Sequence, residues 1–200
     1  IIKSLASRFH PILLVLGLCA SSFTQAQTTY YSIISGSWTA NTTWSTTSGG
    51  TGPAGPPTSI DHVVIEGNDN VSIGSNVSCA SIQIGGTGAV TGTGTLSFSA
   101  GSVQLDVSGD LTMGGSNSFR DATISFANAP TIIVGGTVSL GGVGAVAQAT
   151  LDMSPGGILS AGALEVTGTG HSWTPGGDVR LTATNTLPST IFTSFNILRI

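Results

Sequence analysis

TIIVGGTVSLGG, residues 131–142, decides the fold class of this chain. It holds two short runs of apolar and β-branched residues, and each run ends in a pair of glycines. Short runs of this composition, bounded by turn residues, predict β-strands. Similar runs follow one another from about Ile60: HVVIEG, VSI, ASIQIGG, TLSFSAG, VQLDVSG, ATISFAN, ATLDMSPGG, ALEVTGTG, DVRLTAT and FNILRI. Beyond Ala26 no window has apolar residues at helical spacing, so we expect an all-β chain.

The spacing of these runs leaves two all-β architectures open. Some run centres lie about twenty residues apart, whereas Leu140, Met153 and Val166 lie thirteen apart. A β-sandwich also has short strands at comparable intervals, so spacing does not decide. Glycine pairs favour a solenoid, because stacked coils turn sharply at corners where glycine tolerates positive φ. We therefore predict a right-handed parallel β-helix (solenoid) over residues 60–200, with a β-sandwich as the alternative.

Residues 27–59 differ from the rest of the chain. They are rich in Thr and Ser, hold Trp38 and Trp44, and end in the run GGTGPAGPPT, whose prolines do not fit a central strand. The open end of a solenoid exposes strand edges and core. We predict that this segment is an N-terminal cap.

Residues 1–26 indicate export. A basic leader precedes ILLVLGLCASSFTQA, residues 12–26, and small residues at its end suit cleavage before Gln27. The apolar core is shorter than the ~20 residues that span a bilayer, so we expect a signal peptide, no transmembrane span after its removal, and a secreted or outer-surface location. Lipidation at Cys19 is the alternative, and Leu18 before it argues against that.

Charge limits the partners of the chain. Beyond the leader three basic residues remain against nine acidic ones, a net charge of −6, which argues against nucleic acid as a partner.

Cys79 is the only cysteine beyond the leader, so we expect no disulfide within residues 27–200. The chain starts without Met and stops at Ile200 within a strand-like run, so we expect it to be truncated at the C-terminus.

Residues 36–86 support a resemblance to a family. They contain G-x-W, T-W-S, a proline-rich turn and two strand-like runs, at Gly36, Trp38, Thr43, Trp44, Ser45, Pro56, Pro57, Asp61, Val63, Ile65, Val71 and Ile73. This block resembles the start of β-helical surface proteins of gliding-type Gram-negative bacteria and is similar to the glycine-rich family named for its eight glycines. The resemblance implies type IX secretion through a sorting domain beyond Ile200, and adhesin-like behaviour.

Two groups of side chains are candidate sites. Asp61, Glu66 and Asp69 lie close together in the sequence beside His62, and clustered carboxylates make them candidate calcium ligands, although turn and strand-entry roles explain the aspartates better. Trp38, Trp44 and Trp173 are candidate carbohydrate contacts, with the first two alternatively packed as anchors of the cap.

The function that we expect is structural. We predict a cell-surface, adhesin-like region that contacts glycans or other surface proteins, with no catalytic residue assigned and no cofactor besides the possible calcium. The alternative is a polysaccharide-binding or polysaccharide-degrading β-helix protein. An enzyme of that kind requires Asp106, Arg120 and Asp121 to converge on one cleft.

Overall fold

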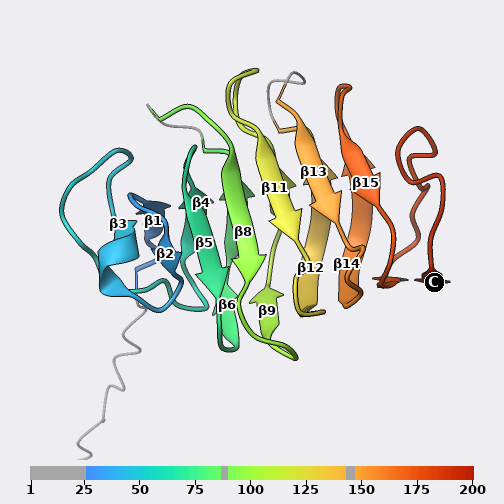
Figure 1. Cartoon of the computed structure of the whole chain (residues 1–200), viewed down its shortest axis with the longest axis horizontal. Coiled ribbons are helices and arrows are strands. Elements are labelled where there is room, and N and C mark those ends of the chain that lie inside the picture. The colour runs from blue at the N-terminus through green and yellow to red at the C-terminus, as the bar shows by residue number, and fades with distance from the viewer. Residues whose placement is uncertain (1–25, 87–89, 143–146) are drawn as a thin grey trace, which may run out of the picture.

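The computed structural model describes residues 26–86, 90–142 and 147–200, which form two β-sheets (Figure 1). Sheet A contains β1 (Thr29–Ser32), β3 (Trp44–Ser45), β4 (His62–Ile65), β6 (Val77–Cys79), β7 (Ser81–Ile84), β9 (Gln104–Val107), β10 (Leu111–Met113), β12 (Thr131–Leu140), β14 (Ile158–Val166), β16 (Asp178–Leu181) and β17 (Ile197–Arg199). Sheet B contains β2 (Gly36–Ser37), β5 (Asn70–Ile73), β8 (Gly94–Phe98), β11 (Ala122–Ser125), β13 (Ala149–Asp152) and β15 (Ser172–Thr174). Within these ranges the one helical element is the 3-10 turn η1 (Asn41–Thr43).

The chain alternates between the two sheets as it advances. Sheet B runs β2, β5, β8, β11, β13, β15 in chain order, so each strand pairs with the strand of that sheet that came before it. In sheet A the strands β4, β7, β10, β12, β14, β16 and β17 likewise follow one another. Apart from β1 with β3 and an isolated bridge between Trp44 and Ala54, the strand pairs of the described ranges are parallel. The chain is therefore all-β with mainly parallel strands, unlike the antiparallel sandwich that was the alternative.

The long strand β12 pairs with two shorter strands of sheet A, β9 and β10, which follow one another in the chain. Its first half pairs with β9 and its second half with β10, and the register of β12 on β14 shifts between Val134 and Thr137. Gly135 and Gly136, which we expected at a corner, lie at this shift inside one continuous strand. Gly141 directly follows β12 with φ +90°, as expected for a corner glycine, and a Cβ there would collide with the carbonyl oxygen of Thr167.

The core consists of apolar side chains stacked at equivalent positions of successive strands. Leu105, Ile132 and Leu159 are register partners on β9, β12 and β14 and are at most 1% exposed. Val71, Leu96, Ile124 and Leu151 form the corresponding row of sheet B and are equally buried. Burial of each such side chain contributes about 1.5–3 kcal/mol, so these rows hold the two sheets together.

Candidate functional site

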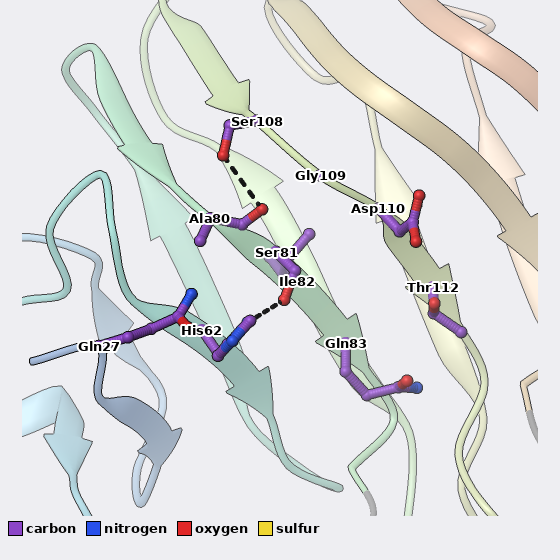
Figure 2. A pocket seen from close by; sticks show the side chains of 10 residues that line it. All are labelled: Gln27, His62, Ala80, Ser81, Ile82, Gln83, Ser108, Gly109, Asp110 and Thr112. Carbon is purple, nitrogen blue, oxygen red and sulfur yellow. Dashed lines mark hydrogen bonds between the residues drawn. The ribbon is translucent and has the colours of Figure 1, made fainter.

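A cavity of about 510 Å³ lies on the outer side of sheet A, over β4, β7 and the start of β10 (Figure 2). Seven polar side chains line it, from the N-terminal segment, these strands and the turn before β10: Gln27, His62, Ser81, Gln83, Ser108, Asp110 and Thr112. Strand alternation explains their direction, because the residues between them, such as Ile82 and Leu111, point into the core.

Hydrogen bonds fix several of these side chains while leaving other polar atoms toward the cavity. His62 Nδ1 lies 2.5 Å from Ser81 Oγ, so the ring is held through one nitrogen and its Nε2 has no hydrogen bond among the described residues (Figure 2). Asp110 Oδ1 accepts from the amide of Thr137 at 2.8 Å. Gln83 Nε2 donates to the carbonyl of Gly114, which fixes the amide plane. The cavity is therefore lined by oriented donors and acceptors.

A second cavity of about 220 Å³ adjoins the first along the same sheet. Thr112 lines both cavities, and the second also touches Ser139, Gly141 and Thr167. Gln83, Thr112 and Ser139 are register partners on β7, β10 and β12. The two cavities thus follow one row of outward-facing side chains that runs across the strands.

The predicted tryptophan contacts lie elsewhere, and two of them are in the core. Trp38 and Trp44 are 1% and 0% exposed and pack edge to face with ring centroids 5.3 Å apart. Trp44 Nε1 donates to the carbonyl oxygen of Trp38 at 2.7 Å. Neither ring has an exposed face on which a sugar could stack. Their burial agrees with the alternative prediction, that they are packed anchors of the N-terminal region.

Trp173 is partly buried at the other end of sheet B. Its ring lies against Phe192 and Phe195, with centroids 5.2 and 5.8 Å away, and its Nε1 donates to the carbonyl of Ser194 at 2.9 Å. The ring is therefore part of an aromatic cluster that joins β15 to the segment before β17.

The three calcium candidates are each bound to separate partners. Asp61 accepts hydrogen bonds from the amide and hydroxyl of Thr58, Glu66 from Ser48 Oγ at 2.6 Å, and Asp69 from Ser32 Oγ at 2.6 Å. Within the described ranges no group of three His, Cys, Asp or Glu side chains could hold a metal ion. The described residues thus contain no assembled calcium site.

Their environments shift the carboxyl pKa values in opposite directions. Burial raises the pKa of Glu66, against the Ser48 hydrogen bond and the charge of Arg120, and burial also raises the pKa of Asp69, against the Ser32 hydrogen bond. Burial acts on Asp61 too, but the hydrogen bonds from Thr58 and Thr28 together outweigh it, so its pKa lies below the ordinary value.

The residues that an enzyme requires do not share a cleft. Asp106 lies in β9 of sheet A, where Gln104 Nε2 donates to it, whereas Asp121 precedes β11 of sheet B and accepts from the amide of Gln148. Arg120 is buried, 6% exposed. Cys79 is also buried, and burial raises the pKa of its thiol to about 12, so its reactive thiolate is scarce at neutral pH.

The cavity residues Ser81, Gln83 and Thr112 were missed in the sequence, and His62 was grouped with the carboxylates. Ser81, Gln83 and Thr112 stand singly in separate runs and are common residue types. The available signal was their alternation with buried residues, which marks them as outward-facing, but pairing them required the register of β7 on β10.

Comparison of the chain with protein-family models, curated proteins and solved structures finds no match. The family resemblance of residues 36–86 therefore stays a prediction. Within the described residues, no helix has the length and apolar character needed to cross a membrane.

Proposed function

We propose that the chain is a right-handed parallel β-helix with an N-terminal cap, and that it is a structural contact region of an exported, adhesin-like surface protein. The observation that carries this proposal is the register of successive strands. Leu105 pairs with Ile132 and Ile132 with Leu159, and equal lengths of chain separate the members of the two pairs. Elsewhere in sheet A the interval varies, from 19 residues between Val63 and Ile82 to 29 between Ile82 and Leu111. Chain that returns again and again to the same position of the same sheet supports a solenoid.

The stacked arrangement suits a rod that presents a surface. Each turn of such a helix, here called a coil, adds parallel hydrogen bonds and another layer of buried side chains to the coil before it. A parallel connection between strands of one sheet is right-handed in nearly all proteins, which is the basis for the proposed hand. Such a stack is stiff because every coil is held on two sides.

The cap assignment is supported by the contacts of residues 27–59. Trp38 and Trp44 supply large buried rings that pack on each other and belong to the same core cluster as the strand residues. Strand β3 lies antiparallel on β1, at the end of the sheet A order. Because β3 has only two residues, it offers little edge for further strand addition.

The outer faces support a role in contact. Thr95, Thr123 and Thr150 are register partners on the solvent side of sheet B, and each is only partly buried. Hydroxyl rows with little charge offer hydrogen bonds to glycans or to neighbouring surface proteins. The degrading alternative is not favoured, because Asp106 lies in sheet A whereas Asp121 directly precedes a strand of sheet B, and two carboxyls must flank one glycosidic bond.

Export through the leader and the type IX route remains part of the proposal. The leader, residues 1–26, lies outside the described residues except for Ala26, so its support is the sequence pattern alone. Expression with this leader in a Gram-negative host, followed by mass spectrometry of the exported protein, should give an N-terminus at Gln27. Retention in the cytoplasm would contradict the proposed location.

The structural role is tested by incubating the exported chain with soluble polysaccharides and measuring reducing ends. We expect no release above a heat-denatured control. Release that disappears in Asp121→Ala would show that the chain is an enzyme and would overturn the proposal. Release that persists in Asp121→Ala would overturn it as well, through a different set of residues.

A further inference from the structure

Two adjoining cavities on sheet A share Thr112 and follow one row of outward-facing side chains. We propose that together they form a groove, defined by His62, Gln83, Asp110, Thr112 and Ser139, that binds a neutral linear glycan. This inference rests on one part of the proposed function: the strands must be stacked in parallel, because that stacking aligns these residues.

The composition of the groove selects an uncharged, hydroxyl-rich ligand. Of the lining residues one is a carboxylate, Asp110, and none is Lys or Arg, so an anionic chain finds no cationic partner there. The remaining polar groups are amides, hydroxyls and the His62 ring. These groups accept and donate hydrogen bonds to sugar hydroxyls without the cost of burying a charge.

The polar groups are already oriented before a ligand arrives. Ser81 holds the His62 ring, the amide of Thr137 holds Asp110, and the carbonyl of Gly114 holds the Gln83 amide. The backbone beneath them is fixed by parallel pairing on both sides of β7 and β10. Side chains held in this way lose little conformational freedom on binding, which favours affinity.

The direction of the groove selects a linear chain. Gln83, Thr112 and Ser139 occupy successive strands, which are about 4.8 Å apart. A ligand in contact with all three therefore extends across the strands and meets one polar side chain on each strand. Successive sugar units of an extended glycan present hydroxyls at a comparable repeat.

A peptide fits this groove less well than a glycan. Extended peptides usually bind to a sheet by adding a strand at a free edge. Strands β7 and β10 are interior strands with a partner on each side, so their backbone groups are already paired. The groove offers side chains rather than an edge.

The test uses the leader-free exported chain and hexasaccharides of β-1,4-glucan, β-1,4-mannan and β-1,3-glucan, with hexagalacturonate as the anionic probe. Isothermal titration is expected to show binding of at least one neutral hexasaccharide and at least tenfold weaker binding of hexagalacturonate. Thr112→Arg places a long cationic side chain at the junction of the cavities, so we expect it to weaken neutral binding at least tenfold. Thr46→Arg, at an exposed position outside both cavities, is the matched control and should leave binding unchanged.

Three results would overturn the groove assignment: no neutral hexasaccharide binds, Thr112→Arg binds as the unmodified chain does, or hexagalacturonate binds most tightly. Circular dichroism and thermal unfolding of the same samples separate this failure from failure of the proposed fold. A cooperatively unfolding β-rich chain that binds no sugar rejects the groove alone. A chain without that transition rejects the stacked fold with it.

Discussion

The indole nitrogen of Trp44 donates a hydrogen bond to the carbonyl oxygen of Trp38, whereas the indole nitrogen of Trp38 has no acceptor among the described residues. Both rings are fully buried and lie in edge-to-face contact. The two residues are thus similar in volume and packing but differ in one hydrogen bond. This difference separates polar from apolar contributions to the stability of the N-terminal region.

Replacement of each tryptophan by phenylalanine should therefore have unequal effects. Trp38→Phe loses packing, which lowers the free energy of unfolding. It also removes a buried N–H that has no acceptor among the described residues, which offsets part of that loss. Trp44→Phe loses the hydrogen bond and leaves the Trp38 carbonyl without that donor, so we expect it to be less stable than Trp38→Phe by about 1–3 kcal/mol. Urea unfolding of the two variants measures the difference, and equal stabilities would contradict this description of the pair.

Adjacent positions of β12 should respond differently to truncation. Ile132 is fully buried in the core row, while Ile133 points outward and is 38% exposed. Ile132→Ala should lower the free energy of unfolding by about 2–5 kcal/mol, because a cavity remains. Ile133→Ala should cost less than about 1 kcal/mol. Chemical denaturation tests both, and a reversed order would mean that the register of β12 is wrong.

The carboxyls near the N-terminal end should contribute to pH dependence with opposite signs. The pKa of Asp61 is lowered in the folded chain, so its stabilisation is complete above the ordinary value of about 3.9 and is lost as pH falls through the folded value. The pKa of Asp69 is raised, so its stabilisation is present below about 3.9 and is lost as pH rises through the folded value.

Unfolding free energies of the unmodified chain, Asp61→Asn and Asp69→Asn across the acidic range test these signs. As pH rises, the stability gap between the unmodified chain and Asp61→Asn should widen in favour of the unmodified chain. The gap to Asp69→Asn should move the other way. Parallel changes in the two gaps would refute the assignment of environments.

Cys79 should resist alkylation in the folded chain. Its side chain is 1% exposed, and burial raises the pKa of the thiol to about 12. Iodoacetamide at neutral pH should label Cys79 only after denaturant is added, as followed by peptide mass mapping. Rapid labelling of the native chain would show that this part of the core opens readily.

Much of the fold could be predicted from local composition, but its repeat could not. Most strands were expected from their apolar runs, whereas the short strands β1, β2, β3, β6, β10 and β15 were not, because short strands depend on pairing more than on propensity. Leu140, Met153 and Val166 are evenly spaced in the sequence, but the chain returns to the same position of sheet A only at every second member of this series. Leu140 and Val166 pair on sheet A, and Met153 follows β13 of sheet B.

The candidate site was less predictable for a related reason. The carboxylates were grouped because they are close in sequence, yet each binds a separate hydroxyl donor. The groove instead joins Gln83, Thr112 and Ser139, which are distant in sequence and meet only through strand register. Sequence proximity therefore does not show which side chains share a surface, whereas the pairing between strands does.

Cross-linking of Thr123 to Thr150 tests the stacked arrangement most directly. These residues are outward-facing register partners on the neighbouring strands β11 and β13. With both replaced by cysteine, mild oxidation should form a disulfide in the folded chain, since neighbouring parallel positions lie within disulfide reach. A Thr123→Cys and Ser139→Cys pair, on different sheets, should not cross-link. Failure of the first pair to react, or equal reaction of both pairs, would contradict a chain whose successive coils stack in parallel register.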